Sequence, residues 1–238
     1  RIVTARKVGM MTVQGVNNMN VKKFKDLCYT SSLVFVNPLV YWEDYREGPL
    51  FQNLKSGKGI KKLKKASMKY GAEEKEAFKV IMSVAPKVRA QCWTHAKDDQ
   101  RMWKEYGNDG VMISASLEGL RKIPFTKRYD VRYVDDPISI QEEIDHIILE
   151  QGIHVSGLFL TKRRAEFAYE QEVRIFQTEG TVDCHDRPDM IDVSVNLKNL
   201  ISSVILHPNA STDTEEIVKN LCMNYGLRYD GKSSVVII

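Results

Sequence analysis

Cysteine is scarce in this sequence, and no two cysteines are close together. The four in the 238-residue chain are Cys28, Cys92, Cys184 and Cys222, and none forms a CxxC pair. A zinc knuckle or a redox-active dithiol needs closely spaced thiols, so we expect neither. We expect reduced thiols in a cytosolic protein, since disulfide frameworks belong to oxidising compartments.

Long apolar runs and a strong excess of one charge are also missing. No run approaches the roughly 18 residues of a membrane-spanning helix, and the N-terminal residues lack the apolar core of a secretory signal. The net charge of +4 permits phosphate or nucleic-acid binding without arguing for it. We therefore predict a cytoplasmic protein with no membrane partner.

Groups of residues typical of metal or thiol chemistry are weak. Asp183-Cys-His-Asp186 offers ligand types, but consecutive residues rarely converge on one ion, so we predict no metal. Cys92 and His95 could form a nucleophile–base pair, but no third, orienting group can be named. A buried free thiol is the more usual role for such a cysteine.

Short helices and strands fill most of the chain without βαβ regularity. Periods of 3.6 and 2 predict helices over 21–28, 72–84, 97–106, 138–151 and 212–225, and strands over 33–36, 88–94, 111–116, 129–134, 190–195, 201–206 and 235–238. We predict a single α+β domain over residues 21–238, with a largely antiparallel sheet and flanking helices. Residues 1–20 have no clear assignment beyond a possible strand over 8–16.

Residues 159–176 carry the pattern on which the functional prediction depends. Their first half is predicted as a helix and their second half as a strand, with Glu170-Gln171-Glu172 at the junction. In a strand, the two carboxylates would point to the same side, roughly 7 Å apart. Like charges on one side are costly when buried, so the face is solvated, is neutralised by the cations at 162–164, or is a site.

The most basic segment is residues 55–69. Its lysines include Lys58, Lys61, Lys62, Lys64 and Lys65. A solvated, mobile loop leading into a helix is one interpretation, and a phosphate-attracting flap is the other. Gly57-Lys-Gly59 is not a Walker loop, because the Lys-Ser/Thr that should follow the second glycine is missing.

Residues 41–48 combine aromatic and acidic side chains. The segment reads Tyr41-Trp-Glu-Asp-Tyr-Arg-Glu-Gly48. Rigid stacking surfaces mixed with charge suit a ligand platform. The structural alternative is that Tyr41, Trp42 and Tyr45 cover the edge of the core.

Several motifs occur in an order that resembles a widespread bacterial and phage family known only as a domain of unknown function. They are Leu33-Val-Phe-Val-Asn-Pro38, Cys92-Trp-Thr94, Met102-Trp-Lys-Glu-Tyr106, Gly110-Val-Met-Ile113 and Glu170-Gln-Glu-Val-Arg174. Thr94 stands where that family usually has serine, the acidic loop lacks the usual Asn-Asp-Pro, and the first twenty residues are unmatched. This resemblance implies no activity.

A more distant resemblance is to mono-ADP-ribosyltransferases, which carry Glu-x-Glu on a late strand and Ser-Thr-Ser on an earlier one. Here Glu170-Gln-Glu172 and Ser114-Ala-Ser116 match those motifs. The resemblance implies a split antiparallel sheet that binds NAD as a substrate. It makes Glu172 the essential carboxylate and Glu170 the acceptor-side one. The family's early Arg or His has no counterpart that we can place.

The same resemblance assigns the nicotinamide pocket. Ser114 would help to build it, with Trp103 or Tyr106 stacking nearby. Cleavage of the nicotinamide–ribose bond passes through an oxocarbenium-like cation, which a fixed carboxylate stabilises.

Two functional hypotheses follow. The first is an enzyme that cleaves NAD and passes ADP-ribose to a macromolecule, protein or nucleic acid, or to water. The second is a non-catalytic module of a phage or bacterial defence system, which binds nucleic acid or a nucleotide through the lysines of residues 55–69 and exposed aromatics. Glu170 and Glu172 would then belong to an ordinary charged strand.

Overall fold

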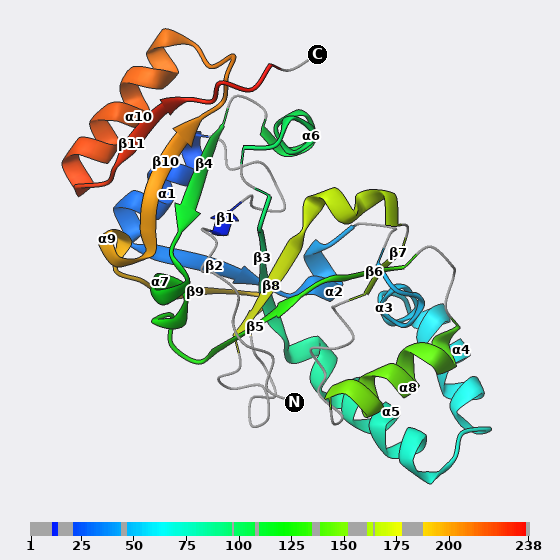
Figure 1. The fold of residues 1–238 in the computed structure, drawn as a ribbon. Coiled ribbons are helices and arrows are strands. Elements are labelled where there is room, and N and C mark those ends of the chain that lie inside the picture. The colour runs from blue at the N-terminus through cyan, green and yellow to red at the C-terminus, as the bar shows by residue number, and fades with distance from the viewer. Residues whose placement is uncertain are drawn as a thin grey trace, which may run out of the picture.

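The computed structural model describes residues 11–13, 21–43, 47–96, 98–107, 110–134, 139–151, 161–163, 165–177 and 188–236. Its framework is one nine-stranded sheet with helices on both faces (Figure 1). The strands of this sheet are β1 (Met11–Val13), β2 (Ser32–Val36), β3 (Arg89–Thr94), β4 (Val111–Ala115), β5 (Thr126–Asp130), β8 (Glu172–Gln177), β9 (Met190–Ser194), β10 (Ile201–Leu206) and β11 (Tyr229–Lys232). A separate parallel pair is formed by β6 (Arg132–Val134) and β7 (Thr161–Arg163).

Short and medium helices connect these strands. The α-helices are α1 (Val21–Thr30), α2 (Pro38–Tyr41), α3 (Pro49–Leu54), α4 (Gly57–Ser67), α5 (Ala72–Val84), α6 (Gln100–Met102), α7 (Leu117–Arg121), α8 (Ile140–Gln151), α9 (Leu197–Leu200) and α10 (Thr212–Tyr225). Within the described residues there are also the 3₁₀ helices η1 (Ala85–Lys87) and η4 (Ala165–Glu170) and the π-helix η2 (Trp103–Gly107). Among the described residues, no helix is both long and apolar enough to cross a membrane.

The sheet forks at β3. On one edge, β8 pairs with β3 along its whole length. On the other edge, β1 pairs at Thr94 and β2 pairs at Ala90. One branch continues through β4, β10 and β11, and the other ends at β9. Every pair in this sheet is antiparallel except β10 with β11, which confirms the predicted α+β class and largely antiparallel sheet.

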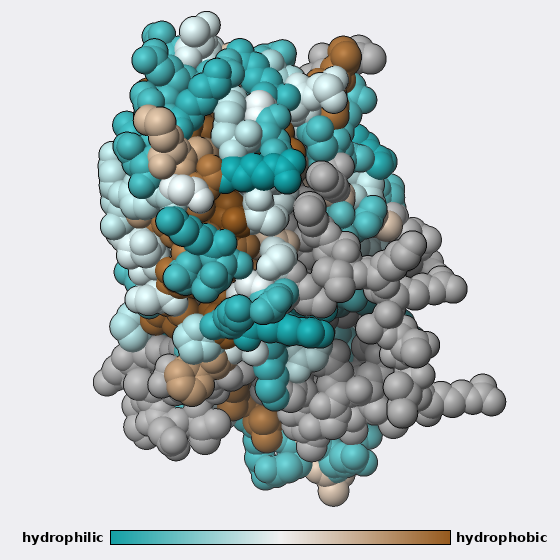
Figure 2. Space-filling model, turned by 60° about the vertical axis from the view of Figure 1, so that its left-hand side comes forward, coloured by the Kyte–Doolittle hydropathy of each residue, from teal (hydrophilic) through white to brown (hydrophobic). Residues whose placement is uncertain are grey.

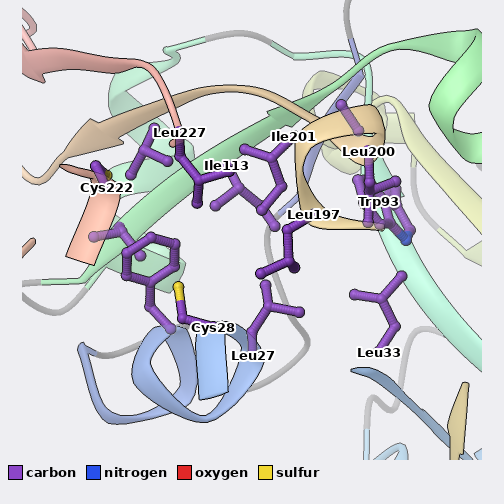
Figure 3. Packing of buried hydrophobic residues seen from close by; sticks show 14 of the residues in the cluster. Leu27, Cys28, Leu33, Trp93, Ile113, Leu197, Leu200, Ile201, Cys222 and Leu227 are labelled. Atoms are coloured by element: carbon purple, nitrogen blue, oxygen red, sulfur yellow. The ribbon is translucent and has the colours of Figure 1, made fainter. Parts of the chain in front are cut away.

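The larger core lies between the sheet and the pair α1 and α10. Each helix buries a short apolar stripe at helical spacing: Phe24, Leu27 and Cys28 from α1, and Val218, Leu221 and Cys222 from α10. Figure 3 shows Leu27 and Cys28 projecting toward Ile113 of β4 and Leu197 of α9. α10 has the bounds predicted from its periodicity, and Gly226, at φ 64°, ends it in the left-handed conformation.

The surface on this side is mostly hydrophilic. Figure 2 brings forward the side that lies on the left in Figure 1, and hydrophobic side chains appear there as a narrow band between hydrophilic ones. On α1 and α10, Tyr29 and Met223 stay mostly exposed.

A second core covers the opposite face of the sheet near β3 and β8. It is built by α3, α4, α5 and α8, which lie together in Figure 1. Their buried side chains include Phe51, Leu63, Phe78, Ile81 and Ile144, and they pack with Ala90, Cys92 and Phe176 of the sheet.

The lysine-rich segment forms a helix, so the expected mobile loop is wrong over residues 57–67. Ser56 caps the helix by accepting a hydrogen bond from the Gly59 amide at 3.0 Å. Leu63 is fully buried and anchors α4 in the second core. One cap and one anchor are enough to order a segment whose remaining side chains are largely polar.

Residues 161–163 also differ from their prediction, because they form β7 rather than part of a helix. The strand pairs in parallel with β6, and this pairing between distant segments overrides the local helical pattern. The predicted strand over 129–134 is divided at Val131 because β5 pairs with β8 while β6 pairs with β7.

Two other predicted elements are altered. Of the helix predicted over 97–106, the structure describes only the short α6 and the π-helix η2. The structure shows a strand that was not predicted, β11 at residues 229–232, on the edge of β10. Of the strand predicted over 235–238, residues 235 and 236 are not in a strand, and 237 and 238 lie outside the described residues.

Close packing of α4 on α3 predicts opposite effects for two glycine substitutions. A methyl group at Gly59 would clash with the backbone carbonyl oxygen of Asn53, whereas nothing lies within 4 Å of one at Gly57. We expect Gly59→Ala to lower the free energy of unfolding by about 1–3 kcal/mol. Gly57→Ala should leave it unchanged or raise it by up to about 1 kcal/mol. Urea unfolding of both variants checks this, and equal effects would contradict the packing of the two helices.

Buried thiols give a second prediction. Cys28, Cys92 and Cys222 are free and buried, while Cys184 lies outside the described residues. Burial raises the pKa of Cys28 to about 12 and that of Cys222 to about 11. Because the thiolate is the reactive form, iodoacetamide at about pH 8 should spare both thiols in the folded protein and modify both in urea. Peptide mass spectrometry measures this, and rapid modification of the folded protein would count against the burial.

Candidate functional site

A fully buried arginine joins two carboxylates on the face of the sheet covered by α3, α4, α5 and α8. The Arg174 guanidinium donates to Glu47 from Nη1 at 2.8 Å and from Nη2 at 2.6 Å. It donates to Glu172 from Nε at 2.9 Å and from Nη2 at 3.1 Å. The side chains of Arg174, Glu47 and Glu172 are 1%, 2% and 9% exposed. Both carboxylates thus accept hydrogen bonds from the planar guanidinium of one side chain.

Trp42 covers this arginine. The Arg174 guanidinium carbon lies 4.3 Å from the centroid of a Trp42 ring, and Trp42 in turn packs against Phe51 of α3 with centroids 6.3 Å apart. The predicted aromatic platform thus contributes Trp42 to the second core, while Tyr41 is exposed and Tyr45 lies outside the described residues.

The Arg174 guanidinium keeps its positive charge in this cluster. Burial by itself lowers the pKa of Arg174, but the carboxylates of Glu172 and Glu47 outweigh burial and raise that pKa well above its ordinary value. The guanidinium therefore stays protonated. Both glutamates accept hydrogen bonds from this one cation.

A bend separates Glu170 from Glu172, so the strand alternation expected across them is wrong. η4 ends at Glu170, β8 begins at Glu172, and Gln171 between them has a φ of 41°. A non-glycine residue with positive φ stores backbone strain. Both glutamates are nevertheless buried, with Glu170 2% exposed.

Hydrogen bonds hold the backbone on both sides of this bend. Each polar backbone atom from the Gln171 amide to the Glu172 carbonyl has a partner, and so has the Glu170 carbonyl. Two amides of the bend donate: that of Gln171 to the Ala168 carbonyl oxygen (3.1 Å) and that of Glu172 to Tyr133 Oη (2.9 Å). Three carbonyl oxygens accept. The Glu170 oxygen accepts from Thr94 Oγ1, the Gln171 oxygen from the His95 amide (3.0 Å), and the Glu172 oxygen from the Val131 amide (2.8 Å). The strained conformation is thereby fixed before any ligand arrives.

Ser114 lies on the same row of the sheet as Glu172. Strand register pairs Glu172 with Thr94, Thr94 with Thr12, and Thr12 with Ser114. Paired residues of neighbouring strands lie on the same face, so Ser114 and Glu172 share a face about 14 Å apart, at about 4.8 Å per strand. Ser114 is fully buried, and its Oγ has no hydrogen-bond partner within the part of the chain that the structure describes.

Trp103 packs next to this row. It is 2% exposed and forms a small core with Met112 and Ile205. Its Nε1 donates to Asp98 at 2.7 Å, and its ring meets His207 edge to face with centroids 5.4 Å apart. Tyr106 follows in the same π-helix.

Arg101 of α6 connects this region to the acidic bend. Its guanidinium carbon lies 4.1 Å from the centroid of the Tyr169 ring, and Tyr169 directly precedes Glu170. Ser114 of β4, Trp103 of η2 and the bend that carries Glu170 and Glu172 therefore lie along one part of the sheet, although they come from three separate segments.

The lysines predicted as an alternative site lie elsewhere. Lys58, Lys61, Lys62, Lys64 and Lys65 are exposed on α4. The structure does not bring them to Glu172. The cation that neutralises Glu172 is Arg174 on the same strand, while the side chains at 162–164 are outside the described set.

Sequence reasoning missed Glu47 and Glu143. Glu47 contacts Arg174 across 127 positions of the chain, and the only signal in the sequence was its place in the aromatic and acidic segment 41–48. Glu143 of α8 is buried, and its Oε2 accepts a hydrogen bond from the Leu50 amide at 2.6 Å. Because the Glu143 carboxylate lies directly against Gly48, α8 holds the segment that carries Glu47.

Within the described residues, no cluster of three or more His, Cys, Asp or Glu side chains could hold a metal ion. The residues 183–186 lie outside this part of the chain.

No family model, curated protein or solved structure matches this chain. The case for a function therefore rests on the geometry of the site, and both resemblances drawn from the sequence remain predictions.

The buried cluster predicts a large dependence of stability on Arg174. Arg174→Met removes the guanidinium that binds both Glu47 and Glu172, and removal of one partner from a buried pair costs about 3–5 kcal/mol. Lys79→Met is the control, because it breaks the exposed Lys79–Glu76 pair and should change stability by less than about 0.5 kcal/mol. Urea unfolding compares them, and equal losses would contradict the role given to Arg174.

Proposed function

We propose that the protein cleaves NAD at the bond between nicotinamide and ribose and passes ADP-ribose to a macromolecule or to water, with Glu172 as the central carboxylate. The observation that carries the proposal is the immobilised bend at residues 170–172. It holds a nearly buried carboxylate whose two oxygens accept hydrogen bonds from one guanidinium. A carboxylate fixed in this way stabilises positive charge without having to reorganise first.

The proposed reaction uses Glu172 electrostatically. As the C–N bond breaks, nicotinamide leaves with the electron pair, and the ribose C1 gains oxocarbenium character. The negative charge of Glu172 stabilises that cation. Arg174 orients the carboxylate through two hydrogen bonds, and Glu47 holds Arg174 in place.

Glu170 has the second role. A nucleophilic oxygen or nitrogen of the acceptor attacks C1 and forms the new bond, and its proton passes to Glu170 as general base. The products are nicotinamide and the ADP-ribosylated acceptor, or free ADP-ribose when water is the acceptor. The bend at Gln171 separates the two carboxylates, so each can serve one partner of the reaction.

Two further features support an ADP-ribosyltransferase-like site. The sheet is largely antiparallel and forks at β3, the strand that pairs with β8, and such a fork is compatible with the split sheet of the proposed NAD-binding fold. Ser114 shares a row and a face with Glu172, with Trp103 packed beside it. The nicotinamide pocket assigned to Ser114, Trp103 and Tyr106 belongs to the same proposal.

The decisive experiment compares two glutamates bound to the same arginine. Glu172→Gln and Glu47→Gln each leave Arg174 paired with one carboxylate, so both variants should fold. We expect Glu172→Gln to lower the rate of nicotinamide release from NAD by about 100-fold or more. Glu47→Gln should keep most of the activity, because Glu47 serves only to hold Arg174. Chromatography of nicotinamide, with and without cell lysate as a source of acceptors, measures both.

Stability measurements complete the comparison. Circular dichroism and urea unfolding must show both variants folded. An equal loss of activity in the two folded variants would make the cluster purely structural and overturn the proposal. The absence of nicotinamide release by the unaltered protein, even with lysate, would do the same.

A further inference from the structure

One side of α4 is a continuous cationic surface. Lys58, Lys61, Lys62 and Lys65 occur at positions i, i+3, i+4 and i+7, which places them on one face of the helix. All four are exposed, and Lys64 flanks them. Over seven residues the face is about 10 Å long. We call these four residues the lysine face.

The lysine face is not used inside the protein. None of its four side chains forms an ion pair or a hydrogen bond with another residue of the described chain. Isolated surface lysines are ordinary, but four on one rigid helical face repel each other unless an anion lies across them.

The opposite side of α4 explains why the lysine face points outward. Gly59 and Leu63 are buried, and Gly59 lies directly against the Asn53 carbonyl oxygen of α3. The apolar side of the helix is thus occupied by the second core. It cannot insert into a lipid surface, as the apolar side of a membrane-binding amphipathic helix must.

We propose that the lysine face binds the phosphate backbone of duplex nucleic acid and that this duplex is the macromolecule that accepts ADP-ribose. The second half of the inference rests on the function proposed above. Lysines one helical turn apart present point charges to successive phosphates, which gives affinity without base readout. A duplex is favoured over a single strand because α4 has no aromatic residue on which unpaired bases could stack.

The position of α4 fits a docking role for this acceptor. α4 packs on α3, and Phe51 of α3 contacts Trp42, which covers Arg174. The lysine face and Glu172 are therefore joined through one packed layer of helices. The duplex supplies a nucleophilic nitrogen or oxygen that bonds to the ribose C1 and loses its proton, while nicotinamide leaves as before.

Binding of a fluorescently labelled DNA duplex, measured by anisotropy in the absence of NAD, tests the docking surface. We expect Lys61→Gln/Lys62→Gln to weaken binding at least about tenfold at low salt and to reduce the slope of log K against log salt by about 2. The control is Lys22→Gln/Lys25→Gln on α1, which removes the same charge from the other side of the sheet and should bind like the unaltered protein.

The outcomes separate the two proposals. Glu172→Gln should bind the duplex normally, because Glu172 lies outside the lysine face. If the unaltered protein binds the duplex but releases no nicotinamide, only the catalytic proposal and the acceptor role fall, and the docking surface stands. No duplex binding by the unaltered protein, or equal binding by the α4 and α1 variants, would overturn the docking surface. So would binding to vesicles of anionic lipid in place of the duplex.

Activity then tests the acceptor. We expect duplex DNA to raise nicotinamide release by the unaltered protein and by the α1 variant, but not by Lys61→Gln/Lys62→Gln. Transfer of label from NAD to the duplex should follow the same order. If duplex DNA leaves the rate of nicotinamide release unchanged in all three proteins, the duplex is not the acceptor.

Discussion

The contact on which this structure most depends is the double ion pair of Arg174. A guanidinium that is 1% exposed would be very costly without partners, and Glu47 and Glu172 accept hydrogen bonds from its Nε, Nη1 and Nη2. Because Glu47 precedes α3 and Glu172 opens β8, the arginine joins the helical layer to the sheet. Trp42 and Glu143 then hold the segment around Glu47 in place. Order at the acidic bend therefore depends on packing far from it in the sequence.

A cluster with two carboxylates and one guanidinium is not the arrangement that stability alone favours. A one-to-one pair would neutralise Arg174, and apolar side chains of similar volume often stabilise a core as well as an ion pair does. The second carboxylate adds a further buried charged group, and the bend at Gln171 adds backbone strain. Buried charge and strain at the same point are typical of functional sites, which is why we propose Glu172 for the chemistry.

The sequence predicted those parts of the fold whose signals are local. α5 and α10 have their predicted bounds, because an apolar stripe, acidic first turns and, for α10, Gly226 all agree. The helix predicted at residues 161–163 was wrong because these residues pair with β6, which comes from a distant segment. Glu170 and Glu172 could be singled out, but their relation depends on the φ of Gln171, and Glu47 meets Arg174 only in the folded chain. The start of α4 was not predicted, because the glycines and lysines of this segment are typical of a solvated loop. The two helical signals, Ser56 as a cap and Leu63 as an apolar anchor, were weaker.

The carboxylates around Arg174 and the lysines of α4 lie in separate places, and this separation affects how an acceptor could reach Glu172. The cluster around Arg174 contains two carboxylates, and carboxylates repel a phosphate backbone that comes within about 8–10 Å at physiological salt. A polyanionic acceptor thus needs a separate cationic surface to hold it near the carboxylates. The lysine face provides such a surface, because its side chains form no ion pairs within the described chain and α4 is anchored by Leu63 and Gly59 on its other side. An acidic site and a basic docking face are therefore complementary requirements of one reaction on a polyanion.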